Sequence, residues 1–425
     1  MKRSKTRNQA ICLLASLLFG GGQDGWSQTT HSLSTESLNL HAALSIAERD
    51  NPEILAARRR WEAARKRVIQ AATPDKPRLD IERMYAPSGK NPVSGADEKG
   101  VSLTQEIPFP STLYLRGSMA SREAGIREQE YRAKVSEIRA RARSAYAMLY
   151  LAQRSLEIFK ENIDLMRRFA KVAESKYAAG HSTQSDALKA QVELTKMLNM
   201  DIVLAQDAQS AAAMLNATLG RPAAAMLGRA GEPPIETLPA AAEDLESAAL
   251  ANRPELRAAA LARERAGRSL ALARSEFLPD FMLQFRSRND PMRGKTRNAM
   301  LGLSIPLWFW KPAAMIGEAS SERDMSQAEL EAMRLMTLSE LHGAFVRAQT
   351  ARRLAEIYDT SVLPQAEAAL KVAESGYQAE KISFLELLDA QRSLLNFRIE
   401  YYQYLSEHQM RVAELERILG GRLRP

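Results

Sequence analysis

The chain has 425 residues, 45% of them apolar and 26% charged, with a formal net charge of +8 at pH 7. No stretch stays apolar over the roughly 20 residues that a membrane-spanning helix needs, so any membrane crossing must be made by strands. Lysine and arginine alternate with glutamate along the predicted helices and form no basic block. This pattern is typical of a solvated helix surface and argues against nucleic acid as a partner.

The first 27 residues have the pattern of a secretory signal peptide. Basic residues precede a short apolar core from Ala10 to Phe19, and the small residues Gly25 and Ser27 fit a cleavage site. A frayed cytosolic N-terminus is the alternative, and the basic-then-apolar order disfavours it. The single cysteine, Cys12, lies inside the apolar core and lacks the small residues that a lipoprotein signal needs before it. We therefore expect an exported mature chain without cysteine or lipid anchor.

The sequence contains an internal repeat. The segment Lys171-Val-Ala-Glu-Ser-Lys-Tyr177 reappears 200 residues later as Lys371-Val-Ala-Glu-Ser-Gly-Tyr377. Pro52-Glu53 likewise matches Pro254-Glu255, and further matches keep the same order at a nearly constant offset. These matches predict a tandem duplication, with repeat 1 over about 40–220 and repeat 2 over about 241–420.

Each repeat begins with a predicted helix, which covers about 40–72 in repeat 1 and about 241–277 in repeat 2. Pro77 and Pro279 follow these helices, and proline ends a helix and is tolerated at the start of a strand.

Short segments of alternating apolar and polar residues come next. Leu79 and Ile81 alternate with Asp80 and Glu82, and a period of two predicts half-buried strands. The alternation predicts two hairpins, at about 79–109 and 280–309, with polar loops at about 86–98 and 287–296.

A long helix follows each predicted hairpin. In repeat 1, apolar residues recur in steps of four and three from Tyr131 to Tyr177. The same seam runs to Tyr377 in repeat 2, with slips near Arg352 and around 362–366. A sustained heptad seam keeps an apolar stripe against a partner helix. A helix of this length is about 90 Å long, so the pattern predicts a rod or a tube.

Both long helices end in a predicted reversal. Gly180 permits a tight turn, and Ser182 or Thr183 caps the returning helix, which runs to about Leu219. The second reversal, residues 378–382, has no glycine, and this leaves its geometry open.

Four strands in one chain cannot close into a barrel, and open strand edges are not tolerated in lipid. Four strands from each of three chains, twelve in all, satisfy what an outer-membrane barrel needs. A small soluble sheet capped by aromatic core residues is the alternative. The aromatic residues that an interfacial belt would use cluster where strand gives way to helix: Phe109, Tyr114, Trp308, Phe309 and Trp310.

With these features together, the chain resembles the TolC family of outer-membrane efflux proteins. The motifs that carry the resemblance are Asn51-Pro52-Glu53, Gln105-Glu-Ile-Pro-Phe109 and the run from Tyr177 to Gln191, with their counterparts in repeat 2. The resemblance covers essentially the whole mature chain, although the lipidation cysteine of some relatives and the second reversal's glycine are missing.

The resemblance implies a mainly α fold with a small β part, assembled as a homotrimer. A twelve-stranded barrel in the outer membrane would continue into a periplasmic coiled-coil tunnel. The tunnel would meet a periplasmic adaptor and, through it, an inner-membrane pump, and the channel would be a passive exit duct without a cofactor. Metal ions and small toxic molecules both remain open as substrates.

The two reversals are the candidate functional sites. We expect the adaptor to dock there, at Tyr177, Gly180, Ser182, Tyr377 and Glu380. Threefold symmetry turns an inward carboxylate into a ring, so the candidates for a cation-selective gate are Asp186, Glu380, Glu386 and Asp389. The alternative is that these are helix N-terminal acids that interact with the helix dipole.

Other functions have less support in the sequence. Met197, Met200, Met333 and Met336 suggest soft-metal binding, yet methionine at helical spacing usually packs, and we expect no metal site. The five histidines are scattered and no catalytic motif is present, so we expect no enzyme. A periplasmic coiled-coil adaptor or scaffold is the main rival, but an adaptor would need β-rich domains around a single hairpin.

Overall fold

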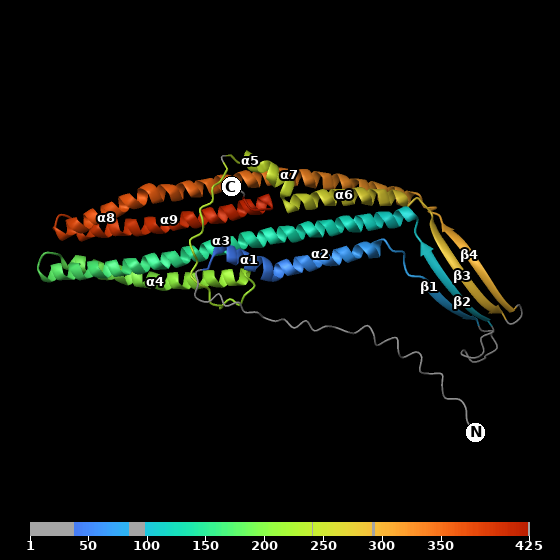
Figure 1. Cartoon of the computed structure of the whole chain (residues 1–425), viewed down its shortest axis with the longest axis horizontal. Helices are drawn as coiled ribbons and strands as arrows, with labels where there is room; N and C mark the ends of the chain where they lie inside the picture. Colours follow the sequence, from blue (N-terminus) through green and yellow to red (C-terminus); the bar gives the residue numbers. More distant parts are fainter. Residues whose placement is uncertain (1–37, 85–97, 240, 291–293, 424–425) are drawn as a thin grey trace, which may run out of the picture.

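The computed structural model describes residues 38–84, 98–239, 241–290 and 294–423. The segment predicted as a signal peptide, residues 1–27, lies outside this part of the chain. The helices form one elongated body, with a four-stranded sheet at one end and two helix reversals at the other (Figure 1). The elements in chain order are α1 (Leu40–Asp50), α2 (Pro52–Ala71), β1 (Arg78–Met84), β2 (Glu98–Ile107), α3 (Pro110–Ala178), α4 (Gln184–Thr218), α5 (Glu243–Asn252), α6 (Pro254–Ser275), β3 (Asp280–Asp290), β4 (Gly294–Ser304), α7 (Trp310–Ile357), the π-helical segment η1 (Tyr358–Val362), α8 (Leu363–Gln378) and α9 (Phe384–Leu419).

The two halves of the chain have the same order of elements: two short helices, two strands, a long helix and a returning helix. The long helix of the first half, α3, has 69 residues, which corresponds to about 100 Å. Within the described residues, the prediction of a mainly α chain with four strands is confirmed.

The helices predicted over 40–72 and 241–277 are each two helices, so that prediction was wrong. Asn51 has extended backbone between α1 and α2, with φ −70° and ψ 124°, and its side chain accepts a hydrogen bond from the Glu53 amide. Arg253 is extended in the same way between α5 and α6. In both places the next residue is a proline, which disfavours helical backbone at the residue before it.

The returning helices end against these breaks. Gly220, just after α4, and Gly420, just after α9, have φ +71° and +65°. A Cβ atom at either position would lie 2.6 Å from a backbone carbonyl oxygen, that of Asp50 or of Asn252. Asn51 secures the first contact by donating from its side-chain amide to the Thr218 carbonyl at 2.9 Å. As a result, α2 and α4 lie end to end along α3 (Figure 1).

The predicted heptad seam forms the core of the helical body. Ile138, Ala142, Ala145 and Leu149 are each at most 1% exposed. Small alanine side chains let the helix backbones approach closely, which suits helices that stay side by side over many turns. In the second half the seam slips where the structure has the π-helical segment η1. A π-helical turn adds one residue to the helix and therefore shifts the register of the stripe.

The four strands form one antiparallel sheet in the order β1-β2-β3-β4. The loop predicted at 287–296 is wrong in extent, because β3 continues to Asp290 and β4 starts at Gly294. Polar side chains on both faces of these strand ends hide the alternation that marks a strand. The loop predicted at 86–98 lies almost wholly outside the described residues.

A connecting segment, described over residues 221–239, crosses the middle of the helical body after α4 (Figure 1). The Tyr146 hydroxyl of α3 has two carbonyl acceptors that share its one hydrogen. The Gly231 oxygen of the connecting segment is 2.8 Å away, and that of Leu38, just before α1, is 2.6 Å away. Burial raises the pKa of Tyr146 to about 12, so the hydroxyl keeps the proton that it donates.

Arg143, one turn before Tyr146, is buried in the same region. Its guanidinium lies 2.5 Å from a Glu236 carboxylate oxygen and 3.0 Å from one of Glu416. It also donates to the Gln409 side-chain oxygen at 2.8 Å. The arginine thereby joins α3 to α9 and to the connecting segment.

Candidate functional site

The two helix reversals have the same backbone geometry. In the first, the Gly180 amide donates to the Tyr177 carbonyl and the His181 amide to the Lys176 carbonyl, at 3.0 and 2.9 Å. In the second, the amides of Glu380 and Lys381 donate to Tyr377 and Gly376, at 3.3 and 2.8 Å. Glu380 therefore has the left-handed conformation of Gly180, with φ 60° against 77°. The missing glycine leaves the turn unchanged and places a strained glutamate in it.

Substituting Glu380→Gly should stabilise the second reversal by about 1 kcal/mol, because glycine has no Cβ to strain in this conformation. Hydrogen exchange at the Lys381 amide should slow by about fivefold. Glu380→Ala keeps the strain and removes the carboxylate, so it should show no slowing. If alanine slowed exchange as much as glycine, the effect would come from the lost charge and not from the backbone.

The carboxylates named as gate candidates lie at the starts of the returning helices. The Asp186 amide donates to Thr183 Oγ1, and the Glu386 amide to Ser383 Oγ, each at 3.3 Å. Thr183, not Ser182, is therefore the cap of α4. Both acids occupy the third position of their helix, where a carboxylate favours the helix dipole.

The remaining gate candidates are on the surface near these starts. Asp389 is 64% exposed and lies 4.0 Å from Arg392. Within the described residues, no hydrogen bond or ion pair joins Glu386 or Asp389 to Glu380 or Asp186. One chain alone does not gather the four acids into a cluster.

Lys176 joins the two reversals to each other. Its ammonium donates to the Tyr377 carbonyl at 2.6 Å and lies 4.7 Å from the centre of the Tyr377 ring. The Glu380 carboxylate is 3.9 Å from Lys176 and 3.5 Å from His181 of the first reversal. Tyr377 is buried and packs on Phe384, whereas its repeat partner Tyr177 is 44% exposed. The two tyrosines of the repeat therefore have different roles.

Residues of the first reversal also affect the ionisation of Tyr377 in the second. Burial and the nearby Asp186 carboxylate raise the pKa of the Tyr377 hydroxyl. Deeper in the body, Arg392 of α9 binds Glu193 of α4, with Nε 2.9 Å from a carboxylate oxygen. These hydrogen bonds hold the pKa of the Glu193 carboxyl below its ordinary value.

Lys176, Glu193 and Arg392 were missed in the sequence. One signal was present for Lys176, since it is the position where the repeated heptapeptide differs, with glycine at 376. A Cβ at Gly376 would lie 3.3 Å from Ile382, so the second copy keeps this position small.

The sheet at the opposite end has two different faces. The strand register places polar residues of neighbouring strands together on one face, where Gln284 donates to Thr104 and Arg286 pairs with Glu82. The other face is apolar yet exposed. Its large side chains are 36–68% exposed: Leu79, Ile81, Val101, Leu103, Leu283, Phe285, Leu301 and Leu303.

The aromatic residues predicted as a belt lie at the strand–helix junctions. Phe109 stacks on Phe281, with ring centres 6.2 Å apart. Trp310 contacts both Trp308 and Phe309, at 5.3 and 5.4 Å, and all three are more than half exposed. Exposed amphipathic rings beside an exposed apolar face are typical of a membrane interface.

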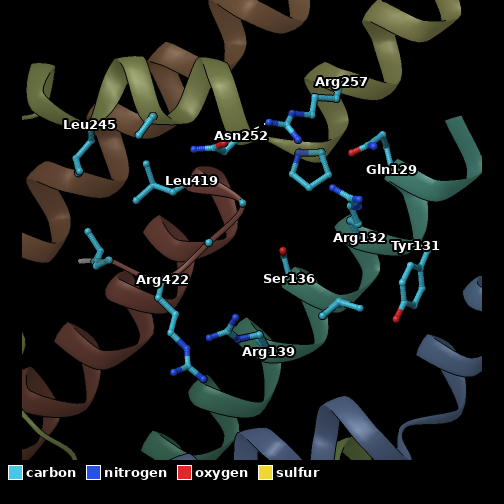
Figure 2. A pocket seen from close by; sticks show the side chains of 16 residues that line it. Gln129, Tyr131, Arg132, Ser136, Arg139, Leu245, Asn252, Arg257, Leu419 and Arg422 are labelled. Atoms are coloured by element: carbon cyan, nitrogen blue, oxygen red, sulfur yellow. Dashed lines mark hydrogen bonds between the residues drawn. The ribbon is translucent and has the colours of Figure 1, made fainter. Parts of the chain in front are cut away.

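A pocket of about 1110 Å³ lies among α3, the α5–α6 break and the end of α9 (Figure 2). Four arginines and no carboxylate line it. Two of these arginines pair with carboxylates outside the pocket, Arg132 with Glu128 and Arg139 with Glu48. The pocket thus marks the junction where α9 meets α6.

Neither a metal centre nor a membrane-spanning helix is found in the described residues. No three His, Cys, Asp or Glu side chains there come together in a way that would hold an ion. No helix in that part of the chain is long and apolar enough to cross a bilayer.

Comparison with known proteins gives a consistent result. The sequence profile of the outer membrane efflux protein family matches the chain twice, over residues 43–221 and 245–421. The cobalt-zinc-cadmium resistance protein CzcC of Cupriavidus metallidurans is 26% identical over 394 residues, which are 90% of each chain.

Solved structures share the fold. CusC, whose crystal structures concern transmembrane channel formation, has a TM-score of 0.79 at 19% identity, covering 91% of this chain and 94% of CusC. The outer-membrane channel OprN has a TM-score of 0.76 at 20% identity over 90% of each chain. VceC of Vibrio cholerae has a TM-score of 0.75 at 19% identity, covering 91% of this chain and 97% of VceC.

Proposed function

The chain belongs to the outer membrane efflux protein family, and we propose that it is the passive exit duct of a tripartite efflux pump. As a member of this family it is an outer-membrane efflux channel, not an enzyme, with a long periplasmic helical part. The finer proposal is that three copies enclose one continuous duct from the periplasm to the exterior.

The observation that carries this proposal is the sheet with its exposed apolar face. Within the described residues, β1 and β4 each pair on one side only. Free strand edges and an apolar face are both unfavourable in water, and a free edge is also unfavourable in lipid. Three four-stranded sheets joined edge to edge make a closed barrel of twelve strands and leave the apolar face to the lipid.

Purified protein in detergent should therefore have the mass of a trimer by light scattering, and it should give stable single-channel conductance in planar bilayers. The free edges of β1 and β4 are the physical reason, since only neighbouring copies can pair with them. A folded, stable monomer in detergent would contradict the barrel.

We further propose that a periplasmic adaptor docks at the reversals, around Tyr177, Gly180 and Ser182 and around Tyr377 and Glu380. These segments end the helical body opposite the sheet (Figure 1), so they are the part farthest from the outer membrane. Both reversals have exposed residues that a partner would reach, Gly180 and Glu380 among them. The adaptor would in turn connect the duct to an inner-membrane pump.

The substrate class that we propose is divalent metal ions. The name of the relative CzcC states cobalt-zinc-cadmium resistance, and that protein aligns over 90% of the chain. Carboxylates at the entrance suit cations, because a ring of like charges in a narrow pore favours the opposite charge.

The gate proposal predicts a change in ion selectivity. Replacing Glu386 and Asp389 together with glutamine and asparagine should lower cation selectivity in planar bilayers several-fold and weaken block by divalent cations, because three copies would lose six carboxylates. A matched control, Glu318→Gln with Glu329→Gln on α7, makes the same charge change near the sheet end. Unchanged selectivity in a correctly assembled double variant would remove Glu386 and Asp389 from the pore.

A further inference from the structure

The apolar face of the sheet carries an unbalanced set of charges. Among the side chains that the structure describes on this face, four are basic and none is acidic. The basic residues, which we call the basic rim, are Arg83, Lys99, Lys295 and Arg297. All four are exposed, and all lie at the hairpin ends of the strands, away from the helices (Figure 1).

The strand register gathers the basic rim into two neighbouring rows. Arg83 is the direct partner of Lys99, and Lys99 is linked through Asn289 to Lys295. Arg297 is two residues beyond Lys295 on the same strand and therefore on the same face. Adjacent strands are about 4.8 Å apart, so the rim is a compact patch.

The basic rim has no counter-charge within the described residues. None of its four side chains makes an ion pair or a side-chain hydrogen bond there. Like charges directly opposite each other on a sheet are destabilising, and Arg83 faces Lys99 in this way. An anion from outside the chain would therefore be favoured at the basic rim, because no described acidic side chain neutralises it.

The opposite face of the same strands is different. There Arg286 and Arg288 both lie near the Glu82 carboxylate, the latter at 3.9 Å, and Arg78 pairs with Asp80 at 2.9 Å. Arginines are therefore neutralised on the polar face and left unneutralised on the apolar face. If the charges served only to keep the hairpins soluble, the two faces would not be expected to differ in this way.

The rim borders the apolar band. Its outer row holds Arg83, Lys99 and Lys295, and Arg297 lies one row further in, level with Ile81 and Val101 at the edge of the band. The next row toward the helices is Leu79, Leu103 and Phe285. The helices are on the periplasmic side, so the hairpin ends point to the cell exterior. Side chains just outside the apolar band on that side lie at the level of the outer-leaflet headgroups.

We propose that the basic rim binds the phosphate groups of phosphorylated glycolipids, of the lipid A type, in the outer leaflet. Lysine and arginine suit phosphate oxygens as charge-assisted donors, and arginine binds them through two parallel hydrogen bonds. The proposal rests on the trimeric barrel proposed above, in which three copies give twelve basic groups around the outer rim. It assigns a lipid partner to a surface that the transport function does not require.

The test uses the purified trimer in detergent and diphosphorylated lipid A as the probe, with bound lipid counted by native mass spectrometry. The quadruple variant R83Q/K99Q/K295Q/R297Q should bind lipid A at least tenfold more weakly, since each basic group near an anionic lipid surface contributes separately. The matched control K160Q/R168Q/K171Q/R353Q removes two lysines and two arginines from exposed positions on the helical body. It should bind as the unchanged protein does.

The outcomes separate this inference from the proposed function. A trimeric, conducting quadruple variant with undiminished lipid A binding overturns the basic rim alone. Failure of the unchanged protein to form a trimer overturns both proposals. Should the variant not assemble, the unchanged protein still decides: at least tenfold preference for diphosphorylated over dephosphorylated lipid A supports the rim, and equal binding overturns it.

Discussion

Replacing Arg143 with alanine is expected to lower the free energy of unfolding by about 3–5 kcal/mol, the typical loss when one partner of a buried ion pair is removed. The Arg143 side chain is 4% exposed and that of Glu416 is 16% exposed. Without the guanidinium, the carboxylates of Glu416 and Glu236 and the side-chain oxygen of Gln409 lose a shared donor in a region that water scarcely reaches. Urea unfolding of the detergent-solubilised protein, followed by far-UV circular dichroism, measures the loss.

The control for this prediction is a surface pair between α7 and α9, the helix that also carries Glu416. Arg347 lies 3.2 Å from Glu414, with both side chains about a third to a half exposed. Arg347→Ala should lower stability by at most about 1 kcal/mol, because solvent screens an exposed pair. Equal losses from the two substitutions would show that the contacts of Arg143 are no stronger than those of a solvated charge.

Arg143 also shows what a single sequence does not reveal. It stands in the run Arg139-Ala-Arg-Ala-Arg143 of a predicted helix, and charged residues on such a helix usually belong to a solvated face. Its partners Glu236 and Glu416 are 93 and 273 residues away. The connecting segment and α9 together enclose it, and no local periodicity in the sequence specifies how they lie on α3.

The parts that were predictable depend on local patterns. The heptad seam correctly indicated the buried stripe of α3, because Ile138, Ala142 and Leu149 repeat at the spacing of one helix face. The four strands followed from alternation in the same way. At the strand ends, where polar side chains occupy both faces, the pattern fails and the loop at 287–296 was drawn too long.

The sequence predicted where the two reversals lie, but not which residues contact each other there. Gly180 and a capping residue placed the first reversal, and the repeat placed the second. Sequence alone did not show that Glu380 adopts φ 60°, nor that Lys176 spans from one reversal to the Tyr377 carbonyl of the other. Contacts between residues some 200 positions apart depend on how two helical hairpins lie together, which no pattern within either hairpin specifies.

The end-to-end joints between helices give the second large expected effect. Gly420→Ala should lower the free energy of unfolding by about 2–5 kcal/mol, from two separate causes. Left-handed backbone costs a residue with a Cβ about 1–2 kcal/mol. The new methyl group would also lie 2.6 Å from the Asn252 carbonyl oxygen and 2.9 Å from Pro254 Cδ, and such overpacking costs about 1–3 kcal/mol more.

Gly180→Ala separates the two causes of this loss. Gly180 has φ +77° but nothing within 4 Å of its missing Cβ, so alanine there should cost about 1–2 kcal/mol from backbone strain alone. Gly220→Ala meets the Asp50 carbonyl oxygen at 2.6 Å but has Pro52 Cδ at 3.5 Å, so its loss should lie above that of Gly180→Ala and at or somewhat below that of Gly420→Ala. If all three variants lost equal stability in urea unfolding, the joints between α4 and α2 and between α9 and α6 would contribute no close packing. Losses at Gly220 and Gly420 well above that at Gly180 would instead show that close packing at these two joints stabilises the helical body.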